Sequence, residues 1–100
     1  VTALLAGCDC MRTVSATVLD QDTKAPLQQV EVRERYGDGT YEELTFTTNE
    51  SGLFVFRDIS GGIRKCPDVE LHFAKKGYVP VDRTFPSATA GDTVFLKAQR

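Results

Sequence analysis

Hydrophobic and polar residues alternate with a period of two along most of the chain after residue 12. Such alternation is typical of β-strands with one buried face, and β-branched and aromatic residues at the apolar positions strengthen the prediction. No stretch of ten or more residues has apolar positions at the spacing of a helix. The pattern therefore predicts an all-β chain, with strands at residues 13–18, 30–32, 44–46, 53–56, 68–73, 78–82 and 93–98.

Six segments rich in turn-forming residues separate these seven strands, at the spacing expected of a sandwich or barrel. We expect side-chain hydrogen bonds from Asp20 and Thr23 to close the first turn, and Gly52 to adopt a positive φ. Pro80, inside the sixth predicted strand, lacks an N–H, which predicts that this strand lies at a sheet edge or is bulged there. The turn segments are residues 20–27, 37–39, 49–52, 60–62, 75–77 and 86–92. The residues expected to be buried are Val14, Val18, Val30, Val32, Phe46, Phe54, Phe56, Val69, Leu71, Phe73, Val94 and Leu96.

Four short motifs follow one another along the chain. They are V-x-D-x-x-T-x-x-P-L-x-x-V-x-V at residues 18–32, T-x-x-x-G-x-F at 48–54, K-G-Y-x-P at 76–80 and T-V-F-L at 93–96. In this order they resemble the carboxypeptidase regulatory-like domain, which is common in envelope proteins of Bacteroidetes. The resemblance covers residues 13–98 and implies a seven-stranded, prealbumin-like (transthyretin-like) β-sandwich. One departure is Ala16, where members of the family often have a glycine.

The N-terminal segment Leu5-Ala6-Gly7-Cys8 matches the bacterial lipobox, in which the cysteine receives a diacylglycerol and the residues ahead of it are removed. The motif directly precedes the first predicted strand. We therefore expect residues 1–7 to be the tail of a lipoprotein signal peptide, 8–12 the lipidated Cys8 and a tether, and 13–100 the β-sandwich domain. The same four letters also occur by chance in buried segments, and no basic region precedes them in this sequence.

The other two cysteines are Cys10 and Cys66, each a few residues ahead of a predicted strand. If Cys8 is acylated, these two remain in a chain exported to an oxidising compartment, where free thiols tend to pair. Their positions allow them to lie at the same end of the sandwich. We predict a Cys10–Cys66 disulfide. Without lipidation Cys8 competes for Cys66, and bacteria that live without oxygen often leave such thiols free.

The residue inventory argues against catalysis, metal binding and nucleic-acid binding. His72 is the only histidine, which is too few for hydroxyisourate hydrolase or the iron site of intradiol dioxygenases, whose folds are related. It lies at an outward strand position, where a solvated or cross-strand-paired side chain is expected. The cysteine spacing does not fit zinc. We predict no enzyme activity, cofactor or metal site, and with a net charge of −2 no nucleic-acid partner.

These observations favour a non-catalytic envelope lipoprotein domain that gives structural support or binds a protein partner. The expected partners are the lipid bilayer, through acylated Cys8, and an envelope protein or glycan, at the periplasmic face or the outer surface. A carbohydrate-binding module is the alternative, and a small hydrolase is less favoured. Leu53, Val55 and Phe95 face away from the core, so we expect them to form a contact patch or a dimer seam, unless loops or a sheet edge cover them. With two further aromatic residues, the predicted interaction surface comprises Leu53, Val55, Phe95, Tyr36 and Tyr41.

Overall fold

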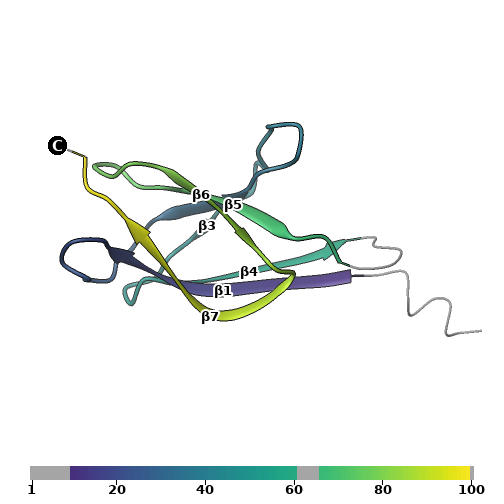
Figure 1. Ribbon diagram of the computed structural model, residues 1–100, viewed down its shortest axis with the longest axis horizontal. Helices are drawn as coiled ribbons and strands as arrows, with labels where there is room; N and C mark the ends of the chain where they lie inside the picture. The colour runs from purple at the N-terminus through teal and green to yellow at the C-terminus, as the bar shows by residue number, and fades with distance from the viewer. Residues whose placement is uncertain (1–9, 61–65, 100) are drawn as a thin grey trace, which may run out of the picture.

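The computed structural model describes residues 10–60 and 66–99, in which seven strands form two sheets that pack face to face (Figure 1). The three-stranded sheet has the order β4-β1-β7 and the four-stranded sheet the order β3-β2-β5-β6. This β-sandwich confirms the predicted fold class. None of the described residues forms a helix long and apolar enough to cross a bilayer. The strands are β1 (Cys10–Asp20), β2 (Glu31–Glu34), β3 (Phe46–Thr47), β4 (Leu53–Ser60), β5 (Val69–Ala74), β6 (Val81–Phe85) and β7 (Ala88–Leu96).

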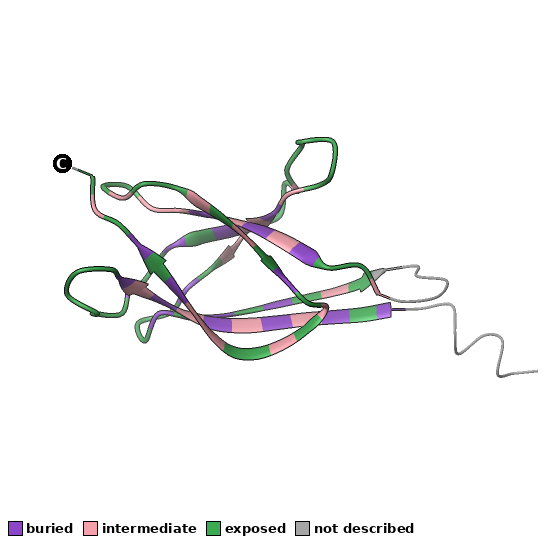
Figure 2. Cartoon of the chain, in the orientation of Figure 1, coloured by how far each residue is buried: buried purple, intermediate pink, exposed green. Residues whose placement is uncertain are grey.

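The central strand of the three-stranded sheet is β1, which pairs antiparallel with β4 and parallel with β7. Its residues alternate between buried and outward positions along its whole length, as Figure 2 shows. The inward positions carry Val14, Ala16 and Val18, which are fully buried. The alternation read from the sequence therefore places this strand correctly across the core.

The core between the sheets consists of aliphatic and phenylalanine side chains. Phe73 makes edge-to-face contacts with Phe54 and Phe85, with ring centroids 5.4 and 6.3 Å apart; such pairs contribute about 0.5–1.5 kcal/mol beyond their buried area. Of the residues expected in the core, all are buried except Phe46, which is partly buried against Phe56. Phe46 is more exposed because β3 is a two-residue strand at a sheet edge.

Most strand boundaries differ from the predicted ones, and the starts of three strands differ by three residues or more. β1 begins at Cys10, within the segment expected to be a tether, because Arg12 points into the core in phase with Val14. β6 begins after Pro80, which cannot donate to a ladder, and it lies at the sheet edge as predicted. β7 begins at Ala88, inside the predicted turn, and its pairing with β1 contains a register shift near Gly91, whose φ is 77°.

Two turns have the predicted chemistry. The carboxylate of Asp20 accepts hydrogen bonds from the backbone N–H groups of Asp22 and Thr23, and the Thr23 hydroxyl accepts one from Ala25. Gly52 has a φ of 77°, and a Cβ atom there would lie 2.6 Å from the carbonyl oxygen of Val18. Only glycine fits this turn without displacing the backbone.

Candidate functional site

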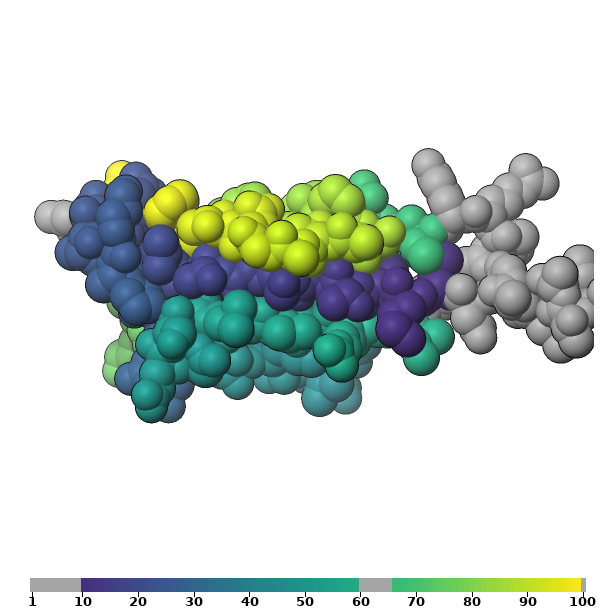
Figure 3. Space-filling model, turned by 90° about the horizontal axis from the view of Figure 1, so that it is seen from below, coloured from purple at the N-terminus to yellow at the C-terminus, as the bar shows by residue number. Residues whose placement is uncertain are grey.

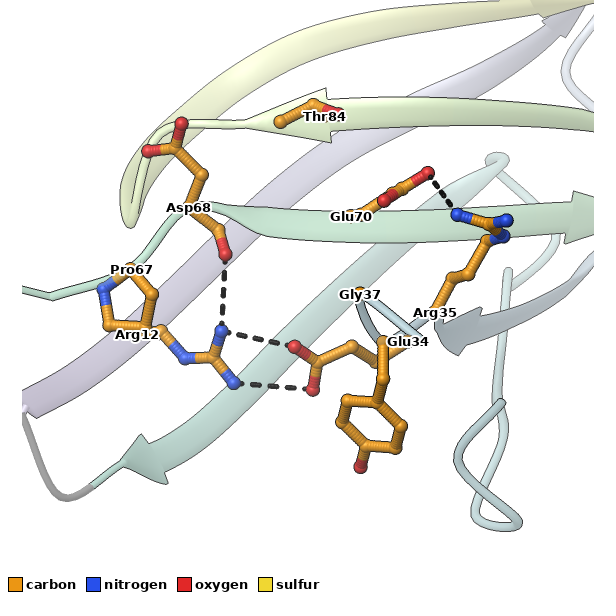
Figure 4. A pocket seen from close by; sticks show the side chains of 9 residues that line it. Arg12, Glu34, Arg35, Gly37, Pro67, Asp68, Glu70 and Thr84 are labelled. Carbon is orange, nitrogen blue, oxygen red and sulfur yellow. Dashed lines mark hydrogen bonds and ion pairs between the residues drawn. The ribbon is translucent and has the colours of Figure 1, made fainter. Parts of the chain in front are cut away.

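A buried arginine closes the core at the end of the sandwich where β1 begins. Arg12 is 6% exposed, and its guanidinium donates to both carboxylate oxygens of Glu34 on β2, at 3.0 and 3.2 Å. It also donates to the carboxylate of Asp58 on β4 and, at 3.3 Å, to the carbonyl oxygen of Asp68 ahead of β5. Figure 4 shows the bonds to Glu34 and Asp68. One side chain from β1 therefore joins both sheets.

The charge of Arg12 is maintained by its partners. Burial opposes the charged form, but the hydrogen bonds to Asp58 and Glu34 outweigh it and raise the pKa of Arg12 above its ordinary value. Among the residues that the structure describes, every buried side-chain nitrogen or oxygen has a hydrogen-bond partner. A buried pair of this kind is costly to break, because either member alone would be an uncompensated buried charge.

Cys10 and Cys66 lie beside this cluster and are joined as a disulfide, with their Cα atoms 5.3 Å apart. Cys10 is the first residue of β1, and Cys66 leads into β5 through Asp68, whose carbonyl Arg12 binds. The bond and the Arg12 cluster therefore hold the start of β1 and the approach to β5 together. Cys8 and the rest of the lipobox, which precede this point in the sequence, lie outside the described residues.

A cleft of about 400 Å³ opens over the Arg12 cluster (Figure 4). Its two arginines are each engaged by a glutamate: Arg12 by Glu34, and Arg35 by Glu70 at 3.2 Å. Within residues 10–60 and 66–99, no group of three or more histidine, cysteine or acidic side chains is arranged to hold a metal ion. The charged groups of the cleft thus serve to join strands.

His72 lies on the outer side of the four-stranded sheet. Its Nδ1 atom is 2.6 Å from Oδ1 of Asp82 on the adjacent strand, and its ring lies 4.9 Å from that of Tyr41. In the described part of the chain, Asp82 is the only hydrogen-bond partner of the imidazole, so no serine, threonine or cysteine side chain bonds to it there. The arrangement is that of a cross-strand pair.

The outer faces of the two sheets differ in chemistry. We call the outer face of β4-β1-β7 the β1 face and that of β3-β2-β5-β6 the β5 face. On the β5 face, outward positions carry several charged side chains, and the Arg35–Glu70 ion pair and the His72–Asp82 hydrogen bond cross between strands. The charged and imidazole strand residues of the β5 face are Glu31, Arg33, Glu70, His72 and Asp82.

The β1 face carries small hydroxyl side chains along its centre and apolar side chains toward its edges. Figure 3 shows this face, with β1 between β4 and β7. Leu53 and Val55 on β4 are each 40% exposed, and Phe95 on β7 is 44% exposed. Among the described strand residues that face outward here, Arg57 is the one charged residue and none is acidic. The central hydroxyl residues are Thr13, Ser15 and Thr17.

The structure brings together three of the five residues predicted as an interaction surface. Leu53, Val55 and Phe95 share the β1 face, whereas Tyr41 contacts His72 on the β5 face. Tyr36, in the same connection as Tyr41, donates a hydrogen bond to Glu42, which raises the pKa of Tyr36 to about 12. The rings of Tyr36, Tyr41 and Phe95 therefore do not form the single flat platform on which a carbohydrate would stack.

Sequence reasoning missed the residues at the start of β1. The sequence pattern places Met11 and Arg12 in a tether, and it points to no site at Ile59 on the neighbouring strand. The one available signal was the phase of Arg12, which continues the inward positions of Val14 and Ala16. Its partner Glu34 is 22 residues away along the chain, so no local pattern reveals the pair.

No protein-family model and no curated protein sequence matches this chain. Solved structures share its fold. A double mutant of the shaft pilin SpaA from Lactobacillus rhamnosus GG superposes with a TM-score of 0.70 at 13% identity, over 91% of this chain and 48% of that one. The pilus 2b backbone protein of group B streptococcus gives 0.60 at 18% identity, over 87% and 41%. The 3-chlorocatechol 1,2-dioxygenase of Rhodococcus opacus 1CP gives 0.58 at 16% identity, over 89% and 60%.

These similarities establish the fold. The chain spans about half the length of the pilins that it resembles. At identities below one in five, the likeness extends to the β-sandwich and leaves the narrower resemblance to carboxypeptidase regulatory-like domains as a proposal.

Proposed function

We propose that this chain is a non-catalytic domain of a bacterial cell-envelope lipoprotein, of the carboxypeptidase regulatory-like type. Acylated Cys8 holds it to a membrane, and the β1 face binds or supports an envelope protein. The observation that carries this proposal is the contrast between the β1 face and the β5 face.

The contrast favours the β1 face because of the cost of removing water. Burying the β5 face would remove water from the Arg35–Glu70 ion pair and from the Asp82 carboxylate, and moving charged groups out of water costs much free energy. On the β1 face, burying the apolar side chains of Leu53 and Val55 is favourable in free energy. The hydroxyl groups on β1 can each donate and accept a hydrogen bond, so a partner's polar groups can satisfy them. The centres of protein interfaces are likewise depleted of charge.

The structural neighbours support a non-catalytic role. Two of them are described as the shaft pilin and the backbone protein of a pilus, so the same fold serves as a structural unit in those proteins. The dioxygenase demonstrates that the fold also occurs in an enzyme. In this chain His72, the residue that a hydrolase would use, has a carboxylate partner in Asp82, but no serine, threonine or cysteine side chain among the described residues bonds to its ring, which lies tilted beside that of Tyr41.

Lipid attachment is tested by replacing Cys8. The variant Cys8→Ala should lose metabolic labelling by palmitate and should move from the membrane to the soluble fraction, because two or three acyl chains are what anchor a lipoprotein stably. Unchanged membrane retention of this variant would contradict the anchor.

Partner binding is tested by placing a charge on each face. Val55→Asp should reduce the amount of a cross-linked envelope complex, whereas Thr84→Asp, at an exposed position on the β5 face, should leave it unchanged. Equal loss in both variants would argue against the β1 face as the binding surface.

A further inference from the structure

The geometry points to a second contact on the β1 face, distinct from the protein-binding region around Val55. We propose that Met11, Arg57 and Ile59 rest on the lipid headgroups of the membrane that holds acylated Cys8. These three residues are called the membrane-end patch. The inference rests on the proposed lipid anchor and adds the orientation of the domain on the membrane.

The membrane-end patch is an exposed apolar pair with a cation beside it. Met11 is 64% exposed and Ile59 65% exposed, and the two are register partners on β1 and β4. Together with Arg57 and Asp58 they line a shallow hollow of about 430 Å³. Single exposed apolar residues are ordinary on protein surfaces, but here two of the most exposed ones lie side by side at one end of a sheet.

The distance along the chain between the anchor and the patch is short. Cys8 precedes Cys10 by two residues, which span at most about 7 Å of extended chain. Cys10 in turn is held by its pairing with Ser60 and by the bond to Cys66. An acylated Cys8 therefore brings the start of β1 within reach of the headgroups, where apolar side chains settle about 5–10 Å deep.

The charges at this end favour a membrane with anionic lipids on the side of the β1 face. Arg57 faces outward on β4 and makes no ion pair within the described parts of the chain, whereas Asp58 faces inward, where Arg12 is shared between it and Glu34. The exposed Asp68 lies toward the β5 face, where Glu70 is already paired with Arg35. Anionic headgroups attract Arg57 on the β1 face and repel Asp68 on the side of the β5 face. The domain is therefore expected to tilt with the β1 face toward the bilayer.

The absence of tryptophan in the chain allows a direct test. Ile59→Trp and, as a matched control, Leu53→Trp place one reporter each on the same face of β4, about 20 Å apart along the strand. Each full, lipidated chain is reconstituted in vesicles of phosphatidylethanolamine and phosphatidylglycerol, part of which carry brominated acyl chains. The emission of Ile59→Trp should shift to the blue and be quenched by bromine, and that of Leu53→Trp should show neither effect. Adding Arg57→Gln should reduce the quenching.

The outcomes separate the patch from the anchor. If the lipidated chain floats with the vesicles but neither reporter is quenched, the membrane-end patch is overturned while the anchor stands. If the chain does not float, both are overturned. If the emission of Ile59→Trp is already blue-shifted without vesicles, in a chain that also carries Cys8→Ala, another copy of the chain covers the patch and the membrane contact is overturned.

Discussion

Replacing Arg12 by methionine tests whether the charged cluster holds the two sheets together. The substitution keeps an apolar stem but leaves Glu34, whose side chain is 10% exposed, as a buried carboxylate without its cation. Breaking a buried pair in this way costs about 3–5 kcal/mol. Asp58 is 37% exposed and regains water, so its lost pairing adds at most about 1 kcal/mol. We expect Arg12→Met to lower the free energy of unfolding by about 4 kcal/mol, a large share of the roughly 5–15 kcal/mol typical of a domain.

A double-mutant cycle identifies the source of this loss. Glu34→Gln leaves Arg12 with Asp58 and a backbone carbonyl, so it should cost less, about 2 kcal/mol. In the double variant no charge is buried without a partner. Its cost should therefore fall short of the sum of the single variants by at least about 2 kcal/mol.

Urea unfolding, followed by far-ultraviolet circular dichroism, measures these differences in the Cys8→Ala chain with the disulfide intact. Arg57→Met is the control, because Arg57 is an exposed arginine without an ion pair among the described residues, and it should change stability by less than about 0.5 kcal/mol. A cost below about 1 kcal/mol for Arg12→Met, or additive costs in the cycle, would show that the Arg12 cluster does not hold the two sheets together.

Three further predictions concern other parts of the sandwich. Cys66→Ala should lower the free energy of unfolding by about 4 kcal/mol, because the bond closes a loop of nearly sixty residues, and a non-reducing peptide map that finds free thiols in the lipidated protein would contradict the bond. Gly52→Ala should cost about 1–3 kcal/mol in chemical unfolding, whereas Gly37→Ala, with no atom within 4 Å of the added carbon, should be nearly neutral; equal effects would count against the turn. Hydrogen bonds from the Thr23 N–H, from Tyr78 and from the Asp22 N–H lower the pKa of Asp20 from 3.8 to about 2, so the stability that they provide is present above about pH 4 and is lost as the pH falls toward 2. Tyr78→Phe should raise the pKa of Asp20 in a carbon-detected NMR titration and should reduce the loss of stability between about pH 4 and 2. An unchanged pKa of Asp20 would argue against the hydrogen bond from Tyr78.

The strands were predictable where inward and outward residues differ in polarity. Alternation located β1, β4 and β5, because their inward positions carry apolar side chains such as Val14, Phe54 and Leu71. Where the alternation is weaker, the observed strand boundaries differ from the predicted ones. Residues 88–92 contain small residues and a glycine that suit a turn equally well, yet they pair with β1 around a register shift.

The candidate site was less predictable because its features depend on contacts between distant segments. Arg12 points inward, whereas its residue type favours a surface position, because arginine is rarely buried unless it is paired. Its partners Glu34 and Asp58 lie 22 and 46 residues away. Outward apolar positions such as Leu53 and Phe95 were visible in the sequence, but only the pairing of β4, β1 and β7 places them on one face.

We propose the β1 face as the contact surface of a membrane-held envelope domain. Site-specific photo-cross-linking in living cells tests it most directly, with a photoreactive amino acid in place of Val55 and, as the control, in place of Thr84 on the β5 face. We expect a discrete cross-linked protein in the membrane fraction with the probe at position 55, and its absence with the probe at position 84. Cross-links of equal yield at both positions, or cross-links at position 84 alone, would contradict it.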